Sequence, residues 1–159
     1  MYILGDEMLI KSTPNRWSCV PAAFATAINV EVQTLIEKIG HDGSEIIFPD
    51  LEEPLCRRAF HVQELCIALF SLGYFVSGYD CLPLALCDED HMYTVEYPDE
   101  KALFKEIMSN SIGVGCGRIQ NTNTTHAFAW NGERCYDPQG FIYPLSRYEL
   151  YSYNIITKR

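Results

Sequence analysis

Several features that mark particular classes of protein are missing from this sequence. It has 12 basic residues against 21 acidic ones, a formal net charge of −9. Because contacts to phosphate need clustered Lys and Arg, nucleic acid is not an expected partner. No apolar stretch approaches about 18 residues, the length that crosses a membrane, and no basic segment precedes a long apolar run at the start. We therefore expect neither a membrane partner nor a signal peptide.

The seven cysteines form neither a disulfide pattern nor a metal site. Their number is odd, their spacings are scattered, and no C-x-x-C pair occurs, which argues against zinc and thioredoxin-type chemistry. We therefore expect no metal, no cofactor and a reducing, cytoplasmic compartment. Most of the cysteines are then small core residues. This group comprises Cys56, Cys66, Cys81, Cys87 and Cys135.

The length of 159 residues, with 48% apolar and 21% charged residues, suits a single domain that buries an ordinary core without disulfides. We expect one domain over residues 1–159. The acidic charge permits a cationic substrate but does not require one. The sequence does not identify the oligomeric state.

Apolar periodicity and turn residues together predict the secondary structure. Helices are expected over residues 18–28, 31–39, 62–72 and 98–108, with a further short one capped by Ser146. Strands are expected over residues 2–10, 74–79, 112–117, 141–143 and 153–157, and on both sides of a hairpin at 126–137. Residues 41–60 mix Gly, Pro and charge and predict an irregular crossing. Helices first and strands later are typical of an α+β domain.

Cys19 begins the first expected helix, in the sequence Ser18-Cys19-Val20-Pro21-Ala22-Ala23-Phe24. Ser18 is a suitable cap, and Pro21 falls in the first turn, where a missing N–H costs little. A thiol at a helix N-terminus feels the positive end of the macrodipole, which favours the thiolate. We therefore expect a depressed pKa for Cys19 and take it as the candidate nucleophile, although a free Cys is by itself more often a core residue.

The dipeptide Asn131-Gly132 is a strong hairpin signal. If these two residues form the loop, Trp130 lies opposite Glu133 and His126 lies opposite Asp137, with Cβ atoms about 4.5–5.5 Å apart. Asp137 then holds one imidazole nitrogen of His126 while the other faces a nucleophile. Cys, His and Asp together are the residue types of a thiol-based acyl-transfer site.

The sequence resembles the papain-like cysteine peptidases, and within them the compact C39-like group, which includes small phage and bacterial members. Five segments carry the resemblance, in the family's order: Cys19-Val20-Pro21-Ala22-Ala23, residues 64–74, Thr125-His126-Ala127-Phe128, Tyr136-Asp137-Pro138-Gln139-Gly140 and residues 144–150. The resemblance implies an α+β, papain-like fold in which N-terminal helices pack on a C-terminal antiparallel sheet. It also implies that Cys19 is the nucleophile, His126 the general base and acid, and Asp137 the orienting residue.

Three features depart from the family's pattern. Val20 follows the nucleophile where the family usually has Gly, and the spacing from His126 to Asp137 is tighter than usual. No Gln precedes Cys19, although the family usually has one upstream that donates to the oxyanion. Asn15 is the amide nearest to that position and becomes the candidate oxyanion donor, although an Asn before a helix is also typical of a turn. Loss of one such donor costs about 10²–10³ in rate.

Three functions remain open after these observations. The first is hydrolysis of a peptide or isopeptide bond in a peptide or protein substrate, through a Cys19 thioester. The second, a transamidase or side-chain amidase, uses the same three residues. The third is a degenerate papain-like module that binds a peptide without activity, which the missing Gln favours. Other residues fit catalysis less well, because they lack a partner at a suitable spacing; these are His41, His61, His91 and Cys116, the last in a glycine-rich strand expected near a cleft.

Overall fold

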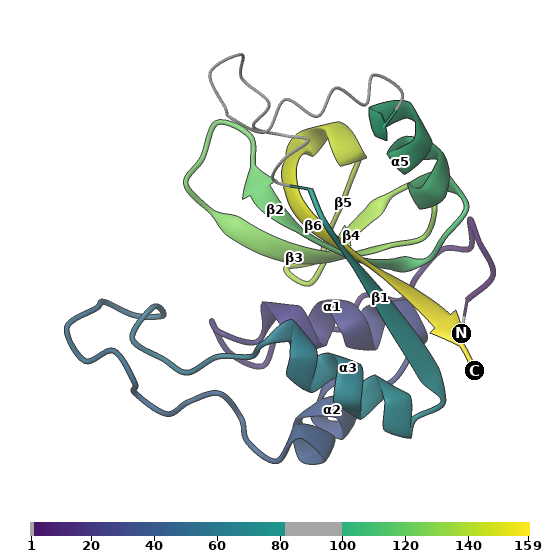
Figure 1. The fold of residues 1–159 in the computed structure, drawn as a ribbon. Helices are drawn as coiled ribbons and strands as arrows, with labels where there is room; N and C mark the ends of the chain where they lie inside the picture. Colours follow the sequence, from purple (N-terminus) through teal and green to yellow (C-terminus); the bar gives the residue numbers. More distant parts are fainter. Residues whose placement is uncertain (1, 82–99) are drawn as a thin grey trace.

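The protein is described from a computed structural model that covers residues 2–81 and 100–159. The described residues form two layers (Figure 1). One layer contains the helices α1 (Cys19–Ile28), α2 (Val32–Ile39) and α3 (Val62–Ser71). The other is a sheet, with α5 (Glu100–Ser109) on the side opposite to α1. Cys87, His91 and the first residues of the expected helix 98–108 lie outside the described residues.

The sheet has six strands in the order β1-β6-β2-β3-β4-β5, and every neighbouring pair is antiparallel. The strands are β1 (Tyr74–Asp80), β2 (Gly113–Ile119), β3 (Thr125–Trp130), β4 (Cys135–Asp137), β5 (Phe141–Tyr143) and β6 (Tyr148–Lys158). The structure confirms, within a few residues, all three expected N-terminal helices, the strands expected over 74–79, 112–117 and 141–143, and the two strands of the hairpin. The last strand is longer than expected because β6 pairs along both β1 and β2.

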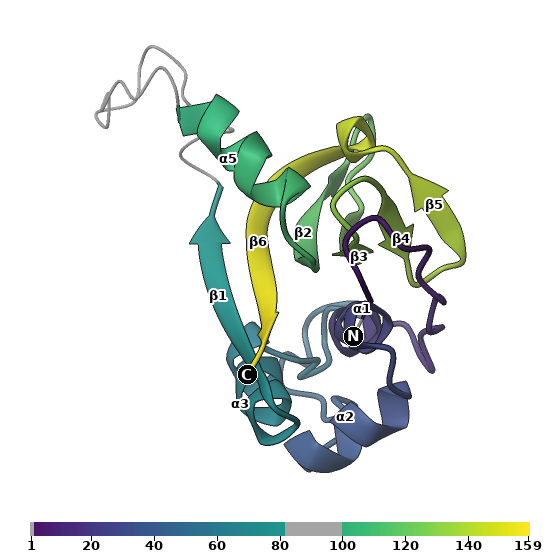
Figure 2. The same cartoon turned by 90° about the vertical axis from the view of Figure 1, so that its right-hand side faces the viewer.

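The helix α1 is enclosed on all sides. Figure 2, which views it nearly along its axis, shows it between the sheet and the other two helices of its layer. Every residue from Pro21 to Ile28 is buried, and its four alanines allow this close approach. The next helix, α2, ends as expected at Gly40, whose φ of 88° lies in the left-handed region that favours glycine. The rigid position of α1 determines where Cys19 lies.

Alternate residues of the central strands face two separate apolar clusters. Val114, Ala127 and Ala129 face α1 and belong to the core that the two layers share. Phe128 and Trp130 face the opposite side, where Met108 of α5 and Tyr153 of β6 pack with them. The same alternation divides the side chains of β4 between the two faces.

Two glycines of β2, Gly113 and Gly115, make room for aromatic rings of the protein itself. A Cβ atom on Gly113 would meet the Tyr153 ring at 2.8 Å, and one on Gly115 would overlap the Phe128 ring. The close approach at these two glycines is therefore made by rings of the cluster on the face opposite α1, here called the outer cluster. Cys116 and Gly117, further along the same strand, pair with Ala127 and His126 of β3.

Two further expectations are wrong. Residues 2–10 form no strand, because their backbone contacts a turn and side chains: Gly5 N–H donates to Asn131 O at 2.8 Å, and Leu9 N–H donates to the Tyr2 hydroxyl at 2.8 Å. Ser146 does not cap a helix but lies within a 3₁₀ turn, Leu145–Arg147, which follows Pro144.

In the part of the chain that the structure describes, no single helix is long and apolar enough to cross a membrane. The helices α1 and α2 reach that length and apolar character only when they are taken together, and the chain bends by 118° between them.

Candidate active site

The start of α1 is held by Asn15. Its Oδ1 accepts the hydroxyl of Ser18 at 2.6 Å and the N–H of Trp17 at 3.1 Å. Ser18 occupies the N-cap position, but its side chain makes no capping bond, so the expectation that it caps the helix is wrong. The Ser18 hydroxyl donates to Asn15 instead, and it accepts no hydrogen bond from the N–H groups in the first turn of α1.

The Cys19 thiol lies against backbone N–H groups from two elements. Those of Ala127 in β3, Val20 and Cys19 itself act on the sulfur, and each favours the thiolate. Burial acts more strongly in the opposite direction, and the negative charge of Asp137 adds to it, so the pKa of Cys19 is raised above its ordinary value. The expected depressed pKa is therefore wrong, because loss of solvent around the sulfur outweighs the favourable N–H groups.

The β3–β4 hairpin turns one residue later than expected. Asn131 N–H donates to Arg134 O at 3.4 Å, so the central residues are Gly132 and Glu133. Gly132 has a φ of 98°, the left-handed conformation that such a first central residue needs. Asn131 instead stands at the corner, where its Oδ1 accepts the N–H groups of Glu133 at 2.9 Å and Arg134 at 2.8 Å.

The later turn gives Asp137 a different cross-strand partner but leaves its side chain on the expected face of the sheet. Trp130 pairs with Cys135, and the same register continued places Asp137 opposite Phe128 and not, as expected, opposite His126. The difference is two residues, and because strand side chains alternate with period two, His126 and Asp137 stay on one face as diagonal neighbours. His126 Nδ1 lies 3.2 Å from Asp137 Oδ2.

The contact between His126 and Asp137 is shielded from solvent, since their side chains are 11% and 1% exposed. The 3.2 Å separation is that of an ion pair, but the angle at Nδ1 does not meet the criterion for a hydrogen bond. Among the described residues, His126 Nδ1 has no other hydrogen-bond partner. Opposite His126 in the β2–β3 pairing stands Gly117, which has no side chain to compete for the imidazole.

The Asp137 carboxylate is held by three groups. Oδ1 accepts the N–H of Gln139 at 2.8 Å, and Oδ2 accepts the hydroxyl of Tyr148 at 2.9 Å and faces His126. Burial alone would raise the pKa of Asp137, but His126, the Gln139 N–H and the Tyr148 hydroxyl together hold it below its ordinary value. The carboxylate is therefore ionised beside the imidazole at neutral pH.

These contacts bring the three sequence-predicted residues to one place. Ala127, whose N–H acts on the Cys19 sulfur, directly follows His126, and the charge of Asp137 reaches that same sulfur. Cys116 also lies nearby: it pairs with Ala127 across β2 and β3. Burial raises the pKa of Cys116 to about 11, opposed by Ser152 and increased by Cys19.

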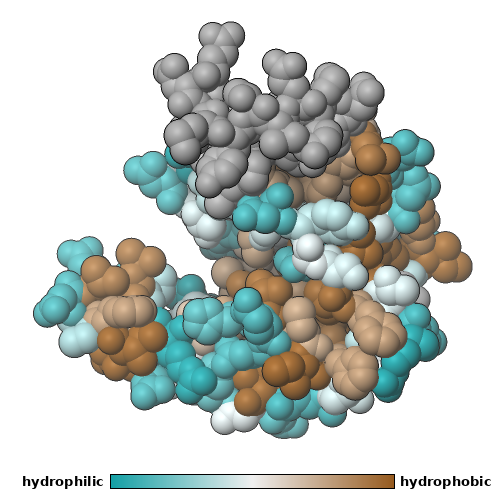
Figure 3. All heavy atoms as spheres, viewed as in Figure 1, coloured by the Kyte–Doolittle hydropathy of each residue, from teal (hydrophilic) through white to brown (hydrophobic). Residues whose placement is uncertain are grey.

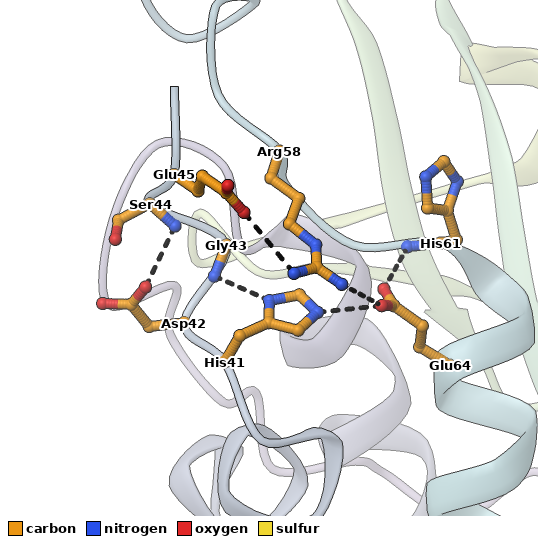
Figure 4. A network of polar contacts seen from close by, with 8 residues as sticks. All are labelled: His41, Asp42, Gly43, Ser44, Glu45, Arg58, His61 and Glu64. Carbon is orange, nitrogen blue, oxygen red and sulfur yellow. Dashed lines mark hydrogen bonds and ion pairs between the residues drawn. The ribbon is translucent and has the colours of Figure 1, made fainter. Parts of the chain in front are cut away.

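Two other histidines, His41 and His61, contact Glu64 at the start of α3. His41 Nε2 lies 2.8 Å from Glu64 Oε1, and Gly43 N–H donates to His41 Nδ1 at 3.1 Å (Figure 4). Glu64 also accepts the His61 N–H at 2.9 Å and pairs with Arg58. This network ties residues 41–60 to the start of α3. No group of three or more His, Cys, Asp and Glu within the described ranges is arranged to hold a metal ion.

The site lies on a hollowed side of the molecule. In Figure 1 the start of α1 and the start of β3 lie on the same side as the projecting residues 41–60. Figure 3 shows the surface indented between this projection and the sheet layer. The projection presents exposed apolar side chains: Ile46, Ile47, Phe48, Leu51 and Leu55. A separate pocket of about 430 Å³, between residues 9–14 and the start of α2, includes none of the three site residues.

No protein-family model matches the sequence, and no curated protein matches it. The structure is similar to that of a double glycine motif protease from an AMS/PCAT transporter, solved in complex with the leader peptide. The superposition covers 96% of this chain and 93% of that chain, with a TM-score of 0.54 and 12% sequence identity. The fold is papain-like, of the C39 type. The expected class, N-terminal helices packed on an antiparallel sheet, is thereby confirmed.

Within this C39-like fold, the sequence pattern does not predict one contact of the site, the hydrogen bond from Tyr148 to Asp137. Tyr148 is one of many aromatic residues in the last third of the chain, all of which predict core packing. Its only distinguishing signal is its place in the 144–150 segment that resembles the family. Its bond to Asp137 depends on where the sheet places the start of β6 relative to β4, which the local sequence does not specify.

Proposed function

We propose that the protein is a cysteine peptidase or isopeptidase in which Cys19 attacks the carbonyl carbon of an amide bond. One observation carries the proposal: the backbone N–H beside the Cys19 sulfur belongs to Ala127, and the residue before it, His126, is paired with the buried Asp137. The papain-like fold supports the assignment, because Cys19 begins α1 and His126 lies on the neighbouring strand β3.

In the proposed reaction, the Cys19 proton moves to His126 as the sulfur attacks, since the raised pKa leaves the resting group a thiol. The tetrahedral oxyanion accepts hydrogen bonds from the Cys19 N–H and the Asn15 amide. The C–N bond then breaks, and the leaving amine takes the proton from His126. Water, deprotonated by His126, attacks the thioester and releases the carboxylate product and the free thiol.

Asn15 supports its proposed role by the way its amide is held. Oδ1 is engaged by Trp17 and Ser18, which fixes the orientation of the amide and leaves Nδ2 as the donor for a ligand above the helix start. Gln120 and Asn121, the alternative donors, are exposed in the turn between β2 and β3. We therefore propose Asn15 in place of the upstream Gln that this chain lacks.

We propose a peptide or protein as the substrate. The structural neighbour was solved with a leader peptide, and the apolar projection formed by residues 41–60 borders the hollowed side of this chain. A transamidase differs only in the acceptor, an amine instead of water. The non-catalytic module remains the second candidate, because Val20 and the absent Gln depart from the peptidase pattern.

Selective labelling and turnover together test the proposal. A peptidyl electrophile should alkylate Cys19 at least about tenfold faster than any other thiol, because the proposed base, His126, directly precedes Ala127, whose N–H acts on the Cys19 sulfur. Hydrolysis of a peptide library should be abolished in Cys19→Ser and retained in Cys66→Ala, which removes a thiol of α3. Labelling of Cys19 no faster than of Cys66, with no turnover by the folded protein, would favour the binding module.

A further inference from the structure

Tyr148 makes a contact that ordinary core packing does not require. The residue is 5% exposed, and its ring packs against that of Phe128 with centroids 4.3 Å apart and the ring planes tilted by 33°. Its hydroxyl, buried with the ring, donates to Asp137 Oδ2 at 2.9 Å. The same oxygen faces His126 Nδ1 at 3.2 Å. The hydroxyl and the imidazole therefore share one carboxylate oxygen.

The outer cluster contains a second buried tyrosine for comparison. Tyr153 is fully buried, and its hydroxyl pairs with Ser111 at 2.8 Å, which satisfies it away from the site. Burial raises the pKa of both tyrosines, so both hydroxyls stay protonated at neutral pH. Tyr148 differs in one respect: its proton is donated to a carboxylate that itself contacts the candidate base.

A chain of contacts places this hydroxyl. Gly115 has no Cβ, which leaves space for the Phe128 ring, and Phe128 supports the Tyr148 ring. Tyr148 pairs with Ile119 at the end of β2, so its side chain stands on the same face of the sheet as Asp137. The position of the hydroxyl is thus set by the sheet and by the aromatic cluster.

We propose that Tyr148 is a positioning residue that acts through Asp137: its hydroxyl fixes the orientation of the carboxylate that orients His126. The proposal rests on the proposed function of the Cys19 site. With Oδ1 held by Gln139 and Oδ2 by Tyr148, the carboxylate is bound at both ends and has one direction in which to face the imidazole. A carboxylate held at one end would rotate away from His126.

The hydroxyl also keeps the carboxylate charged. Asp137 is faced by His126 from β3, Tyr148 from β6, Cys19 from α1 and, on its own strand, Cys135. Burial raises the pKa of Cys135 and of Tyr148, so both groups are neutral around Asp137 at neutral pH. Among these groups, Tyr148 and His126 are those that favour the ionised form of Asp137, and removal of one hydrogen bond should raise its pKa.

The test compares Tyr148→Phe with Tyr153→Phe, two changes that each remove one buried hydroxyl and keep the ring. The carboxyl carbon of Asp137, assigned by comparison with Asp137→Asn, is titrated by NMR. We expect the midpoint to rise by about one pH unit in Tyr148→Phe, the size of one hydrogen bond to a charged group, and to stay unchanged in Tyr153→Phe. An unchanged midpoint in Tyr148→Phe would overturn the proposal, whether or not turnover is found.

Kinetics supply the second readout. We expect kcat on a cleaved peptide to fall about tenfold in Tyr148→Phe with KM unchanged, because orientation of the base acts on the chemical step. In an Asp137→Asn background the same change should have no further effect, and an equal further loss there would overturn the proposal. In the wild-type protein the Tyr148 ring carbon bearing the hydroxyl should titrate with the Asp137 midpoint, which tests the contact should the variant fail to fold.

Discussion

The Cys19 sulfur lies between two opposing influences, burial and a set of backbone N–H groups, and burial prevails. A raised pKa means that the thiolate fraction increases tenfold for each pH unit below that pKa. We predict that the rate of Cys19 alkylation by iodoacetamide rises by about tenfold per unit between pH 6 and pH 8. Peptide mapping by mass spectrometry over this range measures it.

The His126→Asn variant provides the control for this pH dependence. Since burial is the largest influence on the pKa of Cys19 and raises it, the slope should be the same in the variant. A rate that is level from pH 6 to pH 8 in the wild-type protein, and that falls in His126→Asn, would instead indicate a preformed thiolate–imidazolium pair.

Asn15 gives a prediction that separates catalysis from binding. Asn15→Ala removes the proposed oxyanion donor and should lower turnover by about 10²-fold. The alkylation rate of Cys19 should stay close to that of the wild-type protein, because the amide does not act on the resting sulfur. Asn121→Ala is the matched control. Turnover that falls in Asn121→Ala and not in Asn15→Ala would move the oxyanion role to the turn after β2.

At this scale the sequence predicts residue identities better than their electrostatics. The positions of Cys19, His126 and Asp137 follow from a helix start, a hairpin and an ordered set of motifs. The raised pKa of Cys19 does not, because it depends on how deeply the folded chain buries the sulfur. Tyr148 is likewise unmarked, since a tyrosine that packs and one that also donates to a carboxylate have the same local sequence.

Among the elements, the β3–β4 hairpin shows how an incorrect register preserved a correct contact. Asn131-Gly132 correctly predicts a turn, but the Asn131 side chain binds two N–H groups at its corner. The pairing moves by two residues as a result. A displacement of one would have placed Asp137 on the opposite face from His126. The side of the sheet was therefore predictable, while the exact partner depended on a side-chain contact.

The N-terminal residues 2–10 illustrate the other kind of failure. Their apolar residues at both ends predict a short edge strand, yet the sheet edges are already formed by β1 and β5. The segment instead crosses the hairpin turn, where Asp6 O accepts the Asn131 amide at 2.8 Å. Distant segments of the chain compete for the edge of a sheet, so a local sequence pattern cannot predict which of them occupies it.

The strand β2 offers a test of the aromatic support behind the site. Gly115→Ala would drive a Cβ into the Phe128 ring, which is fully buried. We predict a loss of about 1–3 kcal/mol in the free energy of unfolding, the cost of overpacking a core, measured by urea denaturation. Turnover should fall as well, because Phe128 supports Tyr148.

Gly78→Ala in β1 is the matched control for this change. Its added Cβ would meet only the Asn154 side-chain oxygen, at 3.1 Å, and an alanine suits a strand better than a glycine. The free energy of unfolding should change by less than about 0.5 kcal/mol. Equal losses in the two variants would show that strand conformation, and not the Phe128 contact, determines the cost.

For the molecule as a whole, the decisive feature is that its two layers share one core. Side chains from α1, α2 and α3 and from β2, β3, β4 and β6 form a single apolar cluster. Neither layer buries this surface without the other. The Cys19 site lies at their junction, with the thiol on the helical layer and His126 and Asp137 on the sheet. Separation of the layers would therefore expose the core and dismantle the site together.

The two tryptophans report on the two layers separately. Trp17 Nε1 donates to Asp42 O at 2.9 Å beside the helical layer, and Trp130 Nε1 donates to Met108 O at 2.8 Å on the sheet. We predict that Trp17→Phe and Trp130→Phe each unfold in urea with fluorescence and far-UV circular dichroism transitions that coincide, because a shared core makes unfolding all-or-none. Each variant is compared only with itself, so the stability lost with either tryptophan does not affect the result. A fluorescence transition that precedes the dichroism in one variant would mean that its layer unfolds independently, and would contradict a single domain over residues 1–159.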